Sequence, residues 1–209
     1  ACQKPDRQPA TFRLLDAART GISFTNELVP TNELNIFSYM YFYNGSGVGA
    51  GDFNNDGLVD LCFTANSGPN RLYLNKGQLQ FTDVTDQTGI NAGKGWANGV
   101  SVVDINQDGL LDLYISQVSG YGDFKGHNRL FVCREITKAG VPVYDERASE
   151  YGLDLAGLGT QAAFIDYDGD GVLDMFQLNH SLHQNGTFGF RSAFQGKTHP
   201  TAGDRLFRN

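Results

Sequence analysis

Three short acidic stretches contain the residues of this chain that are best suited to chemistry. They read DFNNDGLVD from Asp52, DINQDGLLD from Asp104 and DYDGDGVLD from Asp166. Counted from its first aspartate, each stretch has a side-chain oxygen at positions 1, 3, 5 and 9 and a glycine at position 6. Alternate residues of a tightly curled loop aim at one point, and glycine permits the sharp turn after position 5. The spacing therefore predicts three cation sites lined by oxygen.

The donor set favours calcium. With the backbone carbonyl at position 7 and a bidentate last aspartate, each loop offers about six or seven hard oxygen donors. Magnesium prefers a strict octahedron, and zinc or copper would call for the His or Cys ligands that these loops lack. We expect about three calcium ions, one for each loop. The predicted ligands are Asp52, Asn54, Asp56, Leu58 and Asp60; Asp104, Asn106, Asp108, Leu110 and Asp112; and Asp166, Asp168, Asp170, Val172 and Asp174.

Two other interpretations explain the loops less well. Asp-Gly alone is a favoured hairpin turn, but a hairpin does not need oxygens at positions 1, 3 and 9. The three windows hold three, three and four acidic residues, ten of the 23 in the chain, and these repel unless neutralised. An EF-hand requires a glutamate at position 12 and flanking helices. Position 12 is instead Phe63, Ile115 and Gln177, and the flanking runs resemble strands.

The surroundings of the loops repeat as well. Each loop is followed by an apolar run (LDLCFTAN, LDLYISQV, LDMFQLNH), then by an Arg-Leu-aromatic run (NRLYLN, NRLFVC, DRLFRN). These runs are short, rich in Val, Ile, Leu, Phe and Tyr, and bounded by Gly, Asn and Asp, which is typical of strands. About four strands in each repeat of 50 to 65 residues is the pattern of a β-propeller blade.

The predicted fold is therefore all-β, a β-propeller of four-stranded blades. About three blades fit residues 12–209, at roughly 12–80, 81–143 and 144–209, after a tail at 1–11. Propellers typically carry four to eight blades, so three cannot close a ring. We expect part of a propeller of six or seven blades.

Composition excludes some classes of function. The formal charge is −7 and no basic run is present, so binding to nucleic acid is not expected. No apolar stretch approaches the roughly 18 residues that a membrane span requires. Cys62 and Cys133 lie in apolar runs and are expected to pack as small hydrophobic residues, whereas Cys2 lies in a polar terminus. Two interpretations of Cys2 stay open: an ordinary exposed cysteine, or the lipid-bearing first residue of a bacterial lipoprotein.

The motif D-x-[DN]-x-D-G-x-x-D between two strands, once per blade, resembles the FG-GAP/VCBS repeat of integrin-α-type propellers. The segments YFYNGSGVGAGDFNNDGLVDLCFTAN and NRLYLNKGQLQFTDVTDQTGI are similar to the CRTAC-like branch of bacterial cell-surface proteins. The likeness covers nearly the whole chain from about residue 12. It implies that calcium lies in the loops joining strands 1 and 2 of each blade. The C-terminal ASPIC/UnbV module of some relatives has no counterpart here.

The face opposite the calcium loops is the predicted ligand face. Loops on a rigid scaffold commonly hold binding sites, and the loops joining strands 2 and 3 lengthen along the chain. The candidate ligand-binding residues are Trp96, Tyr121, Phe124, His180, His183 and Arg191. The alternative, that these aromatics only pack the long loops onto the blades, stays open. A transition-metal site at His180, His183 and His199 is disfavoured, because no Cys or carboxylate stands at ligand spacing.

Three functions are compatible with these features. The first is a non-enzymatic, calcium-stabilised module of a secreted or cell-surface protein that binds a protein or glycan, with an outer-membrane lipid anchor at Cys2 as one form of attachment. Calcium is plentiful outside the cytoplasm, which suits weak structural sites. The second is a lyase or glycosidase that acts on polysaccharide, and it requires a general acid and base in a cleft. The third is a purely structural scaffold whose partner binds propeller blades outside these residues.

Overall fold

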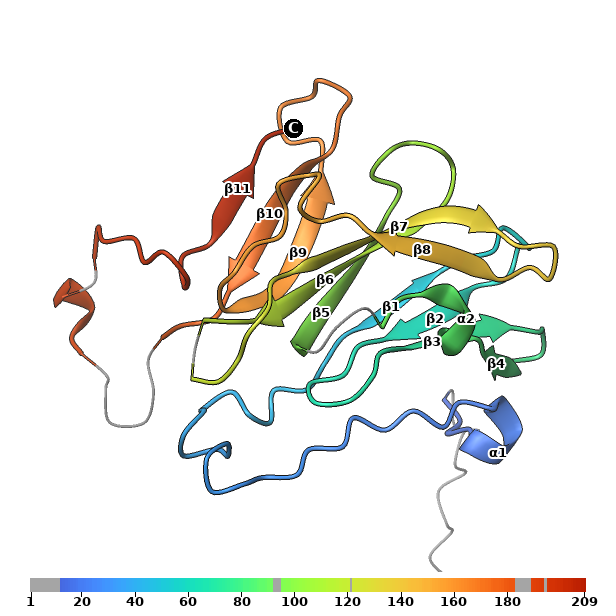
Figure 1. The fold of residues 1–209 in the computed structure, drawn as a ribbon, viewed down its shortest axis with the longest axis horizontal. Helices are drawn as coiled ribbons and strands as arrows, with labels where there is room; N and C mark the ends of the chain where they lie inside the picture. Colours follow the sequence, from blue (N-terminus) through green and yellow to red (C-terminus); the bar gives the residue numbers. More distant parts are fainter. Residues whose placement is uncertain (1–11, 92–94, 121, 183–188, 194) are drawn as a thin grey trace, which may run out of the picture.

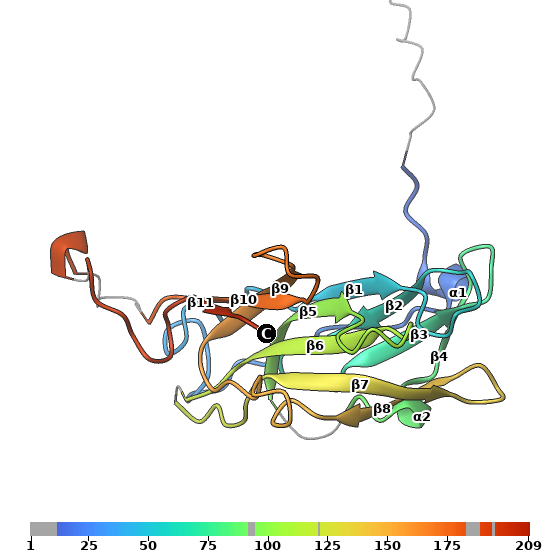
Figure 2. The same ribbon diagram turned by 90° about the horizontal axis from the view of Figure 1, so that it is seen from above.

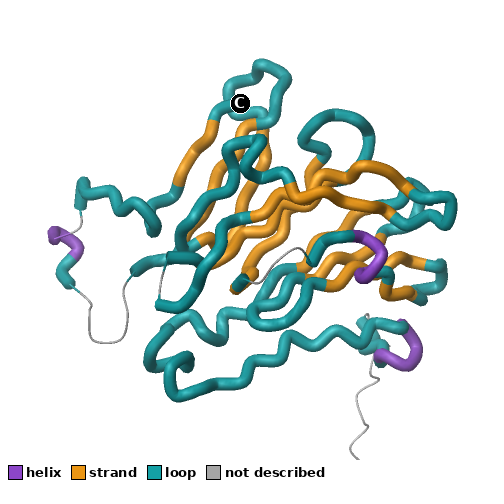
Figure 3. The backbone as a smooth tube through the Cα atoms, in the orientation of Figure 1, coloured by secondary structure: helices purple, strands orange, loops and turns teal. Residues whose placement is uncertain are grey.

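The structure is a computed structural model that describes residues 12–91, 95–120, 122–182, 189–193 and 195–209. In these ranges the helices are single turns, α1 (Ala17–Thr20), α2 (Thr85–Thr88) and the 3₁₀ turn η1 (Arg191–Ala193). Strands and loops make up the rest (Figure 3). The predicted all-β class is confirmed.

Within the described ranges, eleven strands form three antiparallel sheets in chain order (Figure 1). The first sheet contains β1 (Val48–Gly51), β2 (Asp60–Phe63), β3 (Arg71–Asn75) and β4 (Phe81–Asp83). The second contains β5 (Trp96–Val103), β6 (Asp112–Val118), β7 (Arg129–Ile136) and β8 (Pro142–Glu146). The third contains β9 (Gly159–Ile165), β10 (Asp174–Asn179) and β11 (Arg205–Phe207).

Each sheet is a meander of neighbouring strands, which is the strand order of a propeller blade. The sheets do not begin at residues 12, 81 and 144, where the predicted repeat units begin. Residues 81–83 and 142–146 pair with the strands that precede them, so the sheets span 48–83, 96–146 and 159–207. A repeat unit in a sequence can start at any point of its cycle, and only strand pairing fixes where a sheet closes. The described residues form blades of a propeller but no closed ring.

The sheets stack face to face (Figure 2). Alternate residues of a strand point to opposite faces, so one strand can pack on two neighbouring sheets. On β6, Leu113 and Ile115 pack against the first sheet, in a core that includes Leu72 and Leu74. Tyr114, between them in sequence, packs the other way, against the third sheet. All seven residues of β6 are buried, so the second sheet is covered on both faces.

The outer face of the third sheet differs from its counterparts. Strand register makes the pair Phe176 and Leu206 equivalent to Cys62 and Leu72 and to Tyr114 and Leu130. The Cys62–Leu72 and Tyr114–Leu130 pairs are fully buried against the following sheet. By contrast, Phe176 is 39% exposed and Leu206 is 48% exposed. The third sheet thus presents, uncovered, the face that the other two bury between blades.

The N-terminal segment, in blue along the lower side of Figure 1, runs along the first sheet and then crosses the ends of the strands that lie away from the acidic loops. Phe24 stacks on Phe63 with ring centroids 5.0 Å apart, so it covers part of the free face of the first sheet. Further along, Tyr39 and Phe42 pack with Trp96 of the second sheet in a separate core. A segment without regular structure therefore ties the blades together at one end.

No helix among the described residues is long and apolar enough to span a membrane. Cys62 and Cys133 are buried free thiols in the core between the first two sheets, as expected. Cys2 lies outside the described residues.

Close approach of the blades generates the first prediction. A Cβ at position 47 would lie 2.7 Å from Val100 N and 2.9 Å from Asn98 O, both backbone atoms of the neighbouring blade. Replacing Gly47 by alanine should therefore cost about 1–3 kcal/mol, as overpacking does, and lower the Tm by about 2–12 °C. Thermal unfolding followed by circular dichroism measures this shift.

Gly68→Ala is the matched control. Its Cβ would meet only Ala65 Cβ, at an ordinary 3.7 Å, so stability should stay the same or rise slightly. Equal Tm values for the two variants would contradict the blade packing described above.

Candidate calcium loops and the opposite face

The three acidic stretches are hairpin loops that join the first and second strands of each sheet, as predicted. In the first loop, position 4 (Asn55, φ 55°) and position 6 (Gly57, φ 85°) adopt the left-handed conformation. Gln107 and Gly109 do the same in the second loop, and Gly169 and Gly171 in the third. The alternation of ordinary and left-handed residues curls each loop tightly.

The aspartate at position 1 organises the curl. The carboxylate of Asp52 accepts hydrogen bonds from the N–H groups of Asp56 (3.0 Å) and Gly57 (2.8 Å). Asp104 accepts from positions 5 and 6 of its loop in the same way, and so does Asp166. The aspartate at position 5 then accepts from the N–H of position 7, at 2.8–3.0 Å in the three loops. Local hydrogen bonds therefore form one repeated loop shape.

The aspartate at position 9 is buried in all three sheets. Asp60 accepts from Phe53 N at 2.9 Å, within its own loop, and from Asn75 N at 2.7 Å, at the end of β3. Asp112 accepts from Ile105 N and Cys133 N, and Asp174 from Tyr167 N and Asn209 N, at 2.8–3.1 Å. This carboxylate joins the loop to the third strand, a role that the sequence reasoning did not identify.

Burial and crowding raise the pKa values of several of these carboxyl groups. Burial raises the pKa of Asp112 to about 6, against the N–H donors that lower it, and nearby Asp108 and Asp104 raise it further. The pKa of Asp60 is raised for the same reasons. The pKa of Asp168 is also raised, first by loss of hydration and then by repulsion from Asp170 and Asp174. A nearby cation would relieve this penalty.

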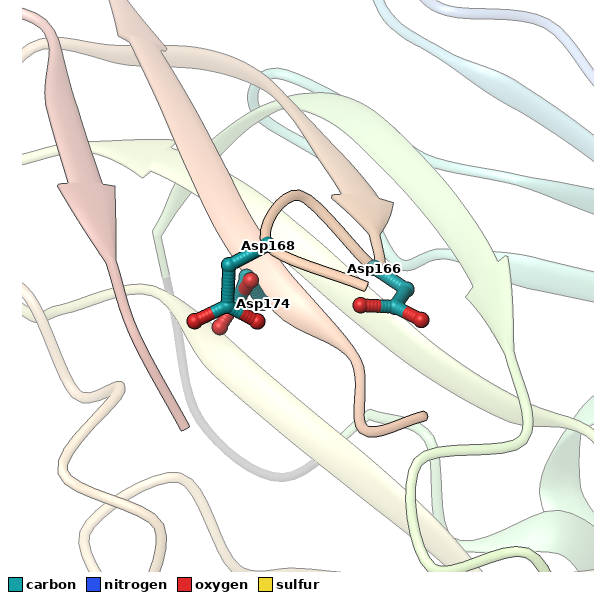
Figure 4. Close-up of side chains that lie close together, drawn as sticks. All are labelled: Asp166, Asp168 and Asp174. Atoms are coloured by element: carbon teal, nitrogen blue, oxygen red, sulfur yellow. The ribbon is translucent and has the colours of Figure 1, made fainter. Parts of the chain in front are cut away.

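The third loop brings three carboxylates together. One oxygen each from Asp166, Asp168 and Asp174 lie within 4.8 Å of one another (Figure 4). The corresponding position 3 in the other loops is Asn54 or Asn106, whose amide nitrogen donates to the aspartate at position 5 at 3.0 and 2.9 Å. The amide oxygens remain acceptors there. The chemistry of the donor sets, all oxygen and rich in carboxylate, fits calcium.

The opposite face gathers part of the predicted ligand-binding set. Trp96 and Phe124 have ring centroids 5.0 Å apart, and both pack on Tyr39. His180 lies on the same Tyr39, which donates its hydroxyl to Nε2 at 2.9 Å, while Nδ1 donates to Ser181 O. Both ring nitrogens are thus engaged, and burial lowers the pKa of His180.

The group does not account for every predicted ligand-binding residue. Tyr121 and His183 lie outside the described residues, and Arg191 begins the turn η1. Sequence reasoning assigned no role to Tyr39 or Tyr41, although the aromatic run YMYFY at 39–43 was a signal for them. Tyr41 stacks on His180 with centroids 4.0 Å apart. Tyr39, Tyr41, Trp96 and Phe124 therefore pack against one another or against His180.

A cavity of about 210 Å³ opens beside the Tyr41–His180 pair. It lies where the innermost strands of the three sheets begin. Its lining consists of Tyr39, Tyr41, Asn44, Gly45, Ser46, Gly47, Asn98, Gly99, Thr160 and His180. Among these described residues are no carboxylate, lysine or arginine, and His180 is the one histidine.

Residues 52–115, which include the first two acidic loops, match the FG-GAP-like repeat family. The chain therefore contains a region similar to FG-GAP-like repeats. It is 32% identical over 141 residues to cartilage acidic protein 1 of Mus musculus and of Homo sapiens. The aligned residues make up 66% of this chain. Cartilage acidic protein 1 of Xenopus tropicalis is 32% identical over 91 residues. The expected FG-GAP and CRTAC-like relationship is confirmed, and the bacterial cell surface stays a prediction.

The chain spans about a fifth of the length of its mouse and human relatives, 21% and 20% respectively. The matching FG-GAP-like region also includes β5 and most of β6, so the family model describes the loop together with the strands that hold it.

The buried aspartate generates the second prediction. Asp60→Ala leaves the N–H groups of Phe53 and Asn75 without their acceptor, so it should destabilise the fold by roughly 2–6 kcal/mol even in chelator. Asp56→Ala removes an exposed carboxylate of the same loop and should cost much less there. Urea unfolding in chelator measures both. Equal stability of the two variants would show that Asp60 does not join the loop to the third strand.

Proposed function

We propose that this chain is a calcium-stabilised β-propeller module that acts outside the cytoplasm and binds a protein or a glycan on the face opposite its acidic loops. The observation that supports it most is the repeated loop, with the same oxygen positions at the same hairpin in three sheets. A lipid on Cys2 would be one way to hold such a module at an outer membrane.

In each loop the oxygens at positions 1, 3, 5 and 9, with the carbonyl of position 7, would hold the ion. When bound, calcium neutralises carboxylates that otherwise repel one another. The chain's own residues supply the shape. The left-handed residues at positions 4 and 6 turn the loop, and the aspartate at position 9 anchors it to the third strand. The ion would thus stiffen one end of each blade.

Extracytoplasmic calcium is about millimolar, and the weaker affinities of extracellular modules match it, with Kd values of about 0.1–1 mM. Each site would then add roughly 0.4–1.4 kcal/mol at 1 mM calcium, and three sites about 1–4 kcal/mol. That is a large share of the marginal stability of a folded protein.

At the cavity beside Tyr41, the lining favours a binding role over a hydrolytic one. Acid–base hydrolysis of a glycoside requires a pair of carboxyl groups or their equivalent. The described lining contains none, and both nitrogens of His180 are engaged. An aromatic surface beside uncharged amides and hydroxyls suits an uncharged polar ligand. The volume is below the 300–1,000 Å³ of pockets for drug-sized molecules, so it fits a single ring or side chain.

Chelation tests the calcium sites. Removal of calcium should lower the Tm by several degrees, because about 1–4 kcal/mol of stabilisation is lost. Adding calcium in excess of the chelator should restore the Tm, and magnesium should not. The measurement is thermal unfolding monitored by circular dichroism. An unchanged melting curve in chelator would overturn the calcium assignment.

The ligand face is tested with a glycan array, together with a pull-down against surface proteins. For whichever ligand is bound, Tyr41→Ala should weaken binding by about two- to tenfold, the value of an aromatic contact. Tyr167→Ala, which removes a tyrosine 60% exposed on the third acidic loop, is the matched control. Equal loss in both variants, or loss only in the control, would place the ligand elsewhere.

A further inference from the structure

The third acidic loop departs from the other two at position 3. The first two loops carry an asparagine there, Asn54 and Asn106, whereas the third carries Asp168. The third loop therefore has four carboxylates where each of the others has three. An added carboxylate next to three others raises the electrostatic cost of the empty loop.

A second departure lies on the third strand of the same sheet. The pairs Leu61–Tyr73, Leu113–Phe131 and Met175–Phe207 occupy equivalent register positions. The residues that follow are Leu74, Val132 and Arg208. Leu74 and Val132 are buried apolar residues, whereas the side chain of Arg208 is 69% exposed. An arginine thus replaces an aliphatic residue in the one sheet whose loop has the additional aspartate.

The two departures meet. Nε of Arg208 lies 2.7 Å from Oδ2 of Asp168, and Nη2 lies 3.8 Å from Oδ2 of Asp170. In the first two loops, the amide nitrogen at position 3 donates to the aspartate at position 5. In the third loop the guanidinium lies between the same two positions and brings a positive charge. Counting Arg208, the third loop has a net charge of −4 + 1 = −3, equal to the −3 of the other loops.

We propose that Arg208 is a built-in counter-cation of the third loop, which balances Asp168 in the absence of metal and competes with calcium for the Asp168 carboxylate. The inference rests on the proposed calcium function. Because Asp168 is both the partner of Arg208 and a predicted calcium ligand, calcium binding requires the guanidinium to move away. Arg208 therefore lowers the affinity of this loop below what its four carboxylates would give.

Calorimetric titration with calcium tests this. The background Asp56→Asn with Asp108→Asn removes one charge from each of the first two loops, so that the third dominates binding. In that background Arg208→Gln should tighten calcium binding by about two- to fivefold, the range for an exposed ion pair, and the gain should shrink as salt is added.

Two matched variants serve as controls. Arg147→Gln removes an arginine from the exposed Arg147–Glu150 pair, outside the acidic loops, and should leave calcium affinity unchanged. In an Asp168→Asn background, Arg208→Gln should no longer change the affinity for calcium, because position 168 then carries no negative charge for Arg208 to neutralise. If the double background does not fold, the same cycle is measured in single variants as the rise in Tm on adding calcium.

The outcomes separate the two ideas. If the unmodified chain binds no calcium, the proposed calcium function falls and this inference falls with it. If the chain binds calcium but Arg208→Gln leaves the affinity unchanged or weaker, or Arg147→Gln tightens it equally, only the counter-cation role is overturned. Tighter binding that depends on Asp168 supports it.

Discussion

Asp60, Asp112 and Asp174 each place a carboxylate at a point where an acidic loop, a second strand and a third strand meet. Each is buried, and each accepts one hydrogen bond from its loop and one from the third strand. Burial of an ionised carboxylate is costly, and two N–H donors offset only part of that cost. The pKa of Asp112, raised to about 6, reflects the balance. The blade thus depends on a group that benefits from a neighbouring cation.

This constraint explains why the rest of the loop is so regular. A buried carboxylate is stabilised where a cation can approach, and oxygen-rich, tightly curled surroundings suit a cation. The left-handed residues and the position 1 aspartate provide that curl through local hydrogen bonds. The apolar residues then stack the sheets by strand alternation, and glycines such as Gly47 let backbones approach closely. Local hydrogen bonds therefore shape the loops, apolar packing holds the sheets together, and one buried aspartate in each blade connects the loop to the sheet.

The features that could be predicted from the sequence are those set by neighbouring residues. The loop positions of Asp52, Asn54 and Asp56, the strand runs and the blade pattern depend on short spacings. The second hydrogen bond of Asp112 comes from Cys133, and the Asp168–Arg208 pair joins residues 40 positions apart, so neither follows from local spacing. Tyr39 also lies in an irregular segment, where no period indicates which side chains are buried. Boundaries between sheets depended likewise on pairing across strands.

The geometry also separates the two ends of each blade. The acidic loops close one end of the inner hairpins, whereas the cavity near Tyr41 lies where the inner strands begin. Residues of β5 and β9 line that cavity together with the segment that leads into β1, so its shape depends on how the blades are packed. A cation in the loops would not touch a ligand there. It would act through the rigidity of the strands between, because a sheet whose second and third strands are joined at one end holds the other end in register. The stability of the acidic loops and the shape of the opposite face are thus linked through the packing of the strands, although no residue belongs to both the loops and the cavity lining.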